Sequence, residues 1–112
     1  MTEITDEYML DMLGKTRDYT LVLLKEGPNW SAPDRDRIVW EHGRRNFALR
    51  ADGPLAIVCP IFDDTPWCGI GIFDAPGDEV APVMDDDPGV RAGIFEYEIH
   101  PVRGFPGSAL PA

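Results

Sequence analysis

Residues 55–73 read LAIVCPIFDDTPWCGIGIF, two apolar runs joined by a segment of turn-forming residues. The runs at 55–62 and 68–73 have the apolar and β-branched composition of strands, whereas the DDTPW between them supplies aspartate, threonine and proline. The stretch therefore predicts a β-hairpin. If its register is centred on Asp63 and Asp64, Cys59 lies near Cys68 in the neighbouring strand.

The segments before this hairpin predict a strand and then a helix. Residues 19–25, YTLVLLK, are almost continuously apolar, and the following EGPNWSAP contains the residues that end a strand. From residue 34 to 51 the pattern is helical, because a charged set falls within an arc of about 100° at 3.6 residues per turn: Asp34, Arg37, Glu41, Arg44 and Arg45. The opposite side, which we expect to be buried, carries Ile38, Val39, Trp40, Phe47 and Leu49.

The remaining elements lie at the two ends of the chain. Residues 75–84 predict a short helix, broken or kinked at Pro82, and the alternation in 94–102 is that of a half-exposed strand. Near the N-terminus, ITDEYMLDMLGKT predicts a short helix that Thr5 caps and Gly14 ends. We therefore divide the chain into a helical extension at 1–18, a domain at 19–102 and a loop-like tail at 103–112.

The order after the first helix is β-α-β-β-α-β, which predicts an α+β protein of ferredoxin-like type. In this fold both helices cover one face of an antiparallel sheet. The first strand is apolar on both sides, with Tyr19, Leu21 and Leu23 on one and Val22 and Leu24 on the other. The face without helices then needs a cover. We expect a homodimer in which two sheets pack face to face as a dimeric α+β barrel.

Composition and charge limit the class of protein. With 112 residues, 44% of them hydrophobic, the chain is long enough for one core and too short for two ordinary domains. Its formal charge of -10 repels phosphate backbones and anionic lipids, so neither nucleic acid nor a membrane is an expected partner. No apolar run approaches the roughly 20 residues that span a bilayer, and the start MTEITDEYML is acidic where a secretory signal is basic. We expect a cytoplasmic protein with reduced cysteines.

The candidate chemistry lies in two segments. His42 falls outside the charged arc of the predicted helix, and Asn46 follows one turn later on the same flank. Asp87 precedes a proline in MDDDPGVRAGIF (84–95), the pattern of a helix N-cap. Because the two helices of a split β-α-β-β-α-β fold lie side by side, this segment can bring its carboxylate beside the first helix. Asp87 would then orient the ring of His42 and fix its tautomer, giving a general acid/base pair without a nucleophile.

Simpler interpretations of these residues remain open. A lone histidine on an apolar helix flank is often a hydrogen-bonded core residue, and Asp87 could act only as a cap. A metal site of His42, Asp87 and His100 is not expected, because the three lack a tight ligand spacing. We interpret His100 as structural.

Several segments together resemble the YCII-related family, in the family's order between residues 19 and 101: LLKEGPNW, the mid-helix His42, Pro60 with Asp63 and Asp64, GIGIF, DPGVRAG and EIHP. The family consists of small dimeric ferredoxin-like proteins, and its histidine–aspartate active site corresponds here to His42 and Asp87. A relative of the family acts as a dehydrochlorinase on a chlorinated hydroxyquinol. The resemblance therefore implies a lyase or isomerase that needs no cofactor and acts on a small cyclic or aromatic compound.

A further set of residues is expected to bind the substrate: Asn46, Trp30, Pro60, Trp67 and Arg91. Trp30 and Trp67 lie in predicted loops, where an aromatic ring can meet a ligand, whereas Trp40 is expected in the core. Arg91 could attract an anionic substrate or merely pair with nearby acids.

Two other functions stay open. The same pocket could belong to a non-enzymatic module that binds a small metabolite or serves a pathway enzyme as an accessory. The dimeric-barrel monooxygenases that need no cofactor share the topology, but fold analogy alone does not establish a function.

Overall fold

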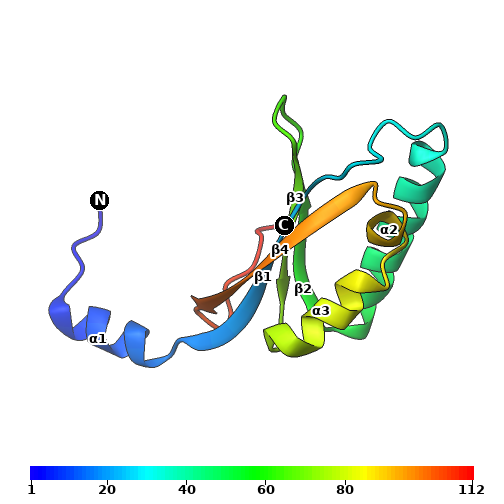
Figure 1. Cartoon of the computed structure of the whole chain (residues 1–112). Helices are drawn as coiled ribbons and strands as arrows, with labels where there is room; N and C mark the ends of the chain where they lie inside the picture. Colours follow the sequence, from blue (N-terminus) through cyan, green and yellow to red (C-terminus); the bar gives the residue numbers. More distant parts are fainter.

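The computed structural model describes all residues from 1 to 112 and has an α+β fold on one four-stranded antiparallel sheet. The elements, in chain order, are α1 (Asp6–Gly14), β1 (Arg17–Glu26), α2 (Arg35–Asp52), β2 (Leu55–Pro60), β3 (Trp67–Phe73), α3 (Gly77–Asp85), α4 (Pro88–Arg91) and β4 (Phe95–Gly104). The strands lie in the order β2-β3-β1-β4, with α2 and α3 on one side of the sheet (Figure 1). This arrangement fits a ferredoxin-like α+β fold in its broad features.

The β2–β3 hairpin forms as predicted, but its register differs from the expected one. Cys59 pairs with Ile70, and the backbone N–H of Ile61 donates to the carbonyl of Cys68 at 2.9 Å, so the two cysteines are not opposite each other. The turn explains the shift, because the Asp63 carboxylate accepts from both the N–H and the hydroxyl of Thr65, at 3.0 and 2.6 Å. These two bonds lower the pKa of Asp63 below its usual value and centre the loop further along the chain.

Helix α2 turns only part of the predicted apolar side to the sheet: Ile38, Val39 and Leu49 pack against the core. Trp40 and Phe47 are 71% and 67% exposed, although both were expected to be buried. Their spacing of seven residues places them on one side of the helix, about half a turn away from Ile38 and Leu49, which pack against the core. The side of α2 that faces the sheet therefore covers a smaller arc of the helix than predicted, and it also carries His42.

The core lies between the sheet and the helices that cover one of its faces. Its buried apolar side chains are Val22, Leu24, Leu55, Phe73, Val80, Met84, Ile94 and Phe95. The other face of the sheet is also apolar, as predicted for β1: Leu21 and Leu23 pair there with Ile72 and Ile70 of β3 and remain partly exposed. The apolar part of this face, on β1 and β3, is therefore uncovered in the single chain, whereas β4 places His100 and Glu98 beside Leu21 and Leu23.

The two ends of the chain differ in how they are held. At the C-terminal end β4 pairs with β1 as far as Gly104 opposite Arg17, so residues 103 and 104 belong to the sheet rather than to the predicted tail. At the N-terminal end α1 forms as predicted, with the Thr5 hydroxyl accepting from the N–H of Tyr8 at 3.1 Å. Helix α1 stands apart from the sheet and buries none of its residues (Figure 1). None of the helices combines the length and the apolar composition that a bilayer crossing requires.

Candidate functional site: a buried histidine–aspartate pair

Asp87 is held in place by its own helix. It is the N-cap of α4, and its Oδ2 accepts hydrogen bonds from the backbone N–H groups of Gly89 and Val90 at 2.9 and 3.2 Å. The predicted capping role is thus confirmed. The side chain is 1% exposed. A carboxylate buried to this degree needs partners for its remaining lone pairs, and capping alone does not supply them.

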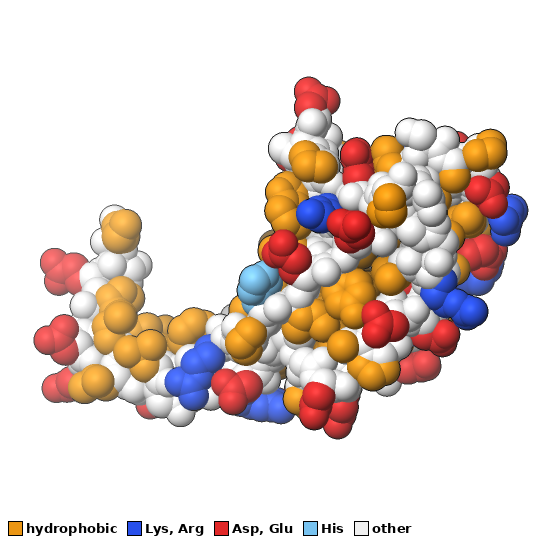
Figure 2. Space-filling model, in the orientation of Figure 1, with side chains coloured by type: hydrophobic (Ala, Val, Ile, Leu, Met, Phe, Trp, Pro, Cys, Tyr) orange, Lys and Arg blue, Asp and Glu red, His pale blue; other side chains and the backbone are white.

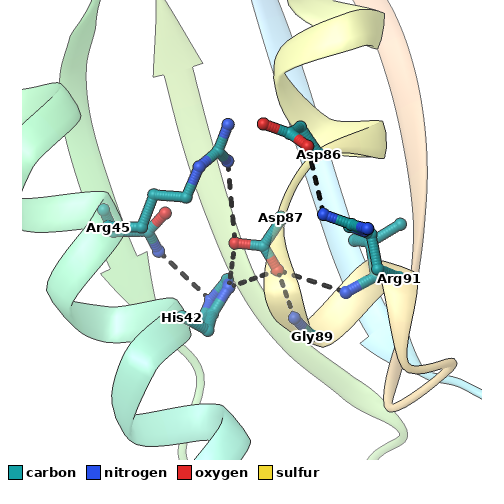
Figure 3. A network of polar contacts seen from close by, with 8 residues as sticks. His42, Arg45, Asp86, Asp87, Gly89 and Arg91 are labelled. Atoms are coloured by element: carbon teal, nitrogen blue, oxygen red, sulfur yellow. Dashed lines mark hydrogen bonds and ion pairs between the residues drawn. The ribbon is translucent and has the colours of Figure 1, made fainter.

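His42 supplies the main partner. Its Nδ1 lies 2.8 Å from Oδ1 and 2.9 Å from Oδ2 of Asp87, so the predicted encounter between the helix and the turn before the last strand takes place (Figure 3). The imidazole is itself buried, at 9% exposed. Because a carboxylate only accepts, Nδ1 carries the proton and donates it toward Asp87. Asp87 therefore both caps α4 and fixes the tautomer and orientation of the ring.

Asn46 contacts the other ring nitrogen. Its Nδ2 lies 3.1 Å from Nε2 of His42, one helical turn away along α2. With the proton on Nδ1, Nε2 has a free lone pair and accepts from the Asn46 amide. Both ring nitrogens of His42 thus have a hydrogen-bond partner: Nδ1 donates to Asp87, and Nε2 accepts from Asn46. Of the residues predicted to bind substrate, Asn46 is the one in direct contact with the pair.

Arg45 is the residue that the sequence reasoning missed. Its Nη1 lies 3.8 Å from Oδ1 of Asp87, is buried, and has no hydrogen-bond partner. Sequence periodicity placed Arg45 in the exposed charged arc, but its side chain is only 25% exposed and turns toward the carboxylate (Figure 3). Its position three residues after His42, and so on the same helix side, was the available signal. A buried donor without an acceptor costs about 1–3 kcal/mol, and the nearby Asp87 carboxylate offsets the charge of the guanidinium.

Aromatic rings pack on the far side of His42. The Phe95 ring lies 4.7 Å from the imidazole, and Trp30 lies 5.9 Å beyond Phe95. Gly89 makes this packing possible, since a Cβ there would come within 2.5 Å of the Phe95 ring. Trp30, a predicted binding residue, is therefore one ring removed from the pair, with the Arg35 guanidinium 4.7 Å above it.

The other predicted binding residues are not joined to the pair. Pro60 is exposed at the end of β2 and Trp67 lies at the start of β3, and no hydrogen bond or ring contact connects either to His42. Arg91 points away from Asp87 and makes an exposed ion pair with Asp86 at 3.5 Å (Figure 3). His100 pairs with Glu98 at 3.1 Å on β4. No three His, Cys, Asp or Glu side chains are grouped so that they could hold a metal ion.

An open hollow of about 430 Å³ lies next to the aromatic side of the site. Its lining residues are Pro28, Val90, Gly93, Phe95, Glu96 and Tyr97. Phe95 belongs to this lining, and its ring also contacts the imidazole, whereas His42 itself does not line the hollow. A second hollow of about 280 Å³, lined in part by Arg17 and Asp74, shares no residue with the site.

No model of a protein family matches the chain, and no curated protein matches it either. The geometry of the His42–Asp87 pair is therefore the basis for the functional argument.

Proposed function

We propose that this chain is a YCII-related protein and a cofactor-independent lyase or isomerase that acts on a small cyclic or aromatic compound. His42 is the general acid/base and Asp87 is its positioning residue. The observation that carries the proposal is the 2.8 Å contact between His42 Nδ1 and a carboxylate that is 1% exposed. A carboxylate in this position holds the ring in the tautomer whose Nε2 can take a proton.

The proton-transfer step follows from the free lone pair on Nε2. In the absence of substrate the Asn46 amide fills that position at 3.1 Å. An acidic C–H of the substrate would displace the amide, and Nε2 would take the proton while Asp87 stabilises the imidazolium that forms. In elimination, the C–H electron pair becomes the new double bond and the leaving group departs as an anion with its own pair. In isomerisation, the imidazolium returns the proton to another atom of the substrate.

Arg45 gives the site a preference for negative charge. Its buried Nη1 has no hydrogen-bond partner and lies 3.8 Å from Asp87. An oxyanion that develops on the substrate, or a departing anion, would supply the missing acceptor. Such stabilisation is strongest where water is excluded, because the field of the guanidinium is less screened there.

The hollow beside Phe95 is of suitable size for the substrate. Small-molecule sites commonly enclose about 300–1,000 Å³, and this hollow has about 430 Å³ with an aromatic wall of Phe95 and Tyr97. A ligand held there reaches His42 only if the Phe95 ring moves aside. Rotation of one side chain is thus part of the proposed binding step.

A screen of phenolic and lactone substrates against wild type, His42→Gln and His42→Ala tests this function. Removing a general base typically lowers the rate by about 10²–10⁴-fold, so turnover should fall by that factor while circular dichroism stays unchanged. Arg91→Gln is the matched control, because Arg91 faces Asp86 in solvent, and its turnover should equal that of wild type. Equal turnover in wild type and His42→Gln would contradict the proposal.

A non-enzymatic module that binds a small metabolite is the second candidate. It is favoured by the contact between Asn46 and Nε2 and by the absence of His42 from the lining of both hollows. The two candidates differ in one result: a binding module keeps its affinity in His42→Gln, whereas the enzyme loses turnover.

We also propose that two copies pack through their uncovered sheet faces into a dimeric α+β barrel, and that the protein is cytoplasmic. Leu21, Leu23, Ile70 and Ile72 lie side by side on that face without cover. A contiguous apolar surface of this kind on a small protein is typical of an interface between subunits.

A further inference from the structure

Helix α1 carries an apolar side that nothing in its own chain covers. Its large apolar residues Tyr8, Met9, Leu10 and Leu13 are 52%, 49%, 72% and 54% exposed. Glu7 and Asp11 lie on the other side, where Asp11 pairs with Lys15 at 2.9 Å. An isolated helix shorter than about 12 residues is marginal in water, and α1 has nine. The helix therefore needs a partner for its apolar side.

The link between α1 and β1 is short and hydrogen-bonded. Only Lys15 and Thr16 separate the end of the helix from β1. The Lys15 N–H donates to the carbonyl of Met12 at 3.1 Å and the Thr16 hydroxyl donates to that of Leu13 at 3.0 Å. The first residue of β1, Arg17, is already paired with Gly104. The hydrogen bonds of the link to α1 and the strand pairing of Arg17 thus hold the helix in this direction relative to β1.

The direction of α1 leads to the side of the uncovered sheet face. In Figure 1 the helix stands out on the side opposite α2 and α3. Figure 2 shows hydrophobic side chains gathered along α1, with open space between the helix and the body of the molecule. A second copy seated on the sheet face would enter this space, and by two-fold symmetry each copy would receive the helix of the other.

The chain exposes more surface than a compact monomer of its mass. A folded monomer of 12.5 kDa exposes about 6,200 Å², whereas this chain exposes 7899 Å². The excess of about 1,700 Å² exceeds the roughly 800 Å² that each partner contributes to a standard interface. The radius of gyration, 16.4 Å, likewise exceeds the value of about 13 Å expected for a compact domain of this length.

We propose that α1 is an exchanged arm, which packs its apolar side onto a second copy of this chain and extends the interface between the two sheets. This inference rests on the sheet-to-sheet dimer proposed above and adds the N-terminal helix to it. The partner is a second copy because the chain presents two uncovered apolar surfaces on one side, and one symmetric association covers both.

Sedimentation velocity on two charge-matched variants tests the arm. Met9→Lys with Leu13→Lys places charge on the apolar side, whereas Glu7→Gln with Asp11→Asn changes the polar side, and both pairs raise the net charge by two. The first pair should raise the dimer Kd at least a hundredfold and the second less than threefold. Circular dichroism should show the sheet of both variants intact, because α1 does not pack on its own core.

The outcomes separate the arm from the dimer. A wild-type dimer whose Kd is unchanged by Met9→Lys with Leu13→Lys would overturn the arm and leave the sheet-to-sheet dimer standing. If wild type stays monomeric at about 100 µM, a concentration at which even a weak complex forms, both the arm and the sheet-to-sheet dimer would be overturned. The activity of His42 is measured separately, so its loss or absence has no bearing on either result.

A photocrosslink shows which chain receives the arm. Benzoylphenylalanine is introduced at Leu10, and equal amounts of ¹⁴N- and ¹⁵N-labelled chains are mixed before irradiation. Mixed-mass peptides that join residues 6–14 to β1 or β3 are expected. Crosslinks of a single isotope only would mean that α1 contacts its own chain, and the proposal would be wrong.

Discussion

At the scale of single residues, Asp87 has two tasks that a substitution can separate. It accepts from the N–H of Gly89 as a helix cap and holds His42 Nδ1 through the same carboxylate. Both tasks have a sequence signal, because an aspartate before a proline predicts a cap and the fold order brings the cap beside the first helix. Phe95 had no such signal, since its contact depends on the missing Cβ of Gly89. Arg45 had only its spacing of three residues from His42, which its place in the charged arc outweighed.

Asp87→Asn should keep the cap and lose the acid/base function. Asparagine caps helices about as well as aspartate, but it removes the negative charge that faces Arg45 and the imidazolium. We expect a loss of about 1–3 kcal/mol in the free energy of unfolding and a fall in turnover of at least about 10²-fold. Urea unfolding and steady-state kinetics measure the two effects. Turnover equal to wild type would show that Asp87 serves only as a cap.

Tyr97 predicts an alkaline change in stability. Burial, and then its 2.6 Å hydrogen bond to Asp85, raise the pKa of its hydroxyl from 10.0 to about 12. Because the unfolded tyrosine ionises first, this contribution to folding is complete below pH 10 and is lost as the pH rises toward 12. Tyr97→Phe should therefore cost about 1 kcal/mol at pH 7 and progressively less above pH 10.

Urea unfolding of wild type and Tyr97→Phe across this pH range measures the difference. Tyr19→Phe is the control, because the hydroxyl of Tyr19 makes no hydrogen bond within the chain. A cost of Tyr97→Phe that stays constant up to pH 12 would contradict the account.

At the scale of elements, the order and type of the helices and strands follow from the periodicity of apolar residues. The hairpin at 55–73 and the alternation in β4 specify strands because neighbouring side chains in a strand point to opposite faces. The buried side of α2 was predicted only in part, because its apolar residues spread around more than half of the helix and periodicity alone cannot rank them. Ile38, Val39 and Leu49 pack on the core, whereas Trp40 and Phe47 are exposed. Contact with the core, which no pattern in the helix encodes, partly buries Leu49, whereas Phe47 is exposed.

Alanine substitutions in α2 test this orientation. Leu49→Ala should cost about 1–3 kcal/mol in the free energy of unfolding, since it removes a side chain that packs on the core. Phe47→Ala should change it by no more than about 0.5 kcal/mol, because the larger side chain is 67% exposed. Thermal and urea unfolding of the two variants give the comparison. A larger loss of stability in Phe47→Ala than in Leu49→Ala would show that the side of α2 with Phe47 packs against the sheet.

At the scale of the whole molecule, the single chain leaves too much apolar surface in water for its mass. The sequence predicted the uncovered sheet face, because β1 is apolar on both sides. It did not predict the direction of α1, which is set by the two-residue link and the paired start of β1. The dimer and the arm remain proposals that share one interface, whereas the His42–Asp87 pair is formed entirely within one chain.

The most direct test of the acid/base role is the exchange of carbon-bound hydrogen for deuterium. Phenolic and lactone compounds are incubated with the protein in D₂O, and loss of their acidic C–H signals is followed by proton NMR. Wild type should speed the exchange of at least one compound, by a factor that falls about 10²-fold or more in His42→Gln. Equal exchange with wild type and His42→Gln would contradict the claim that His42, held by Asp87, moves a proton.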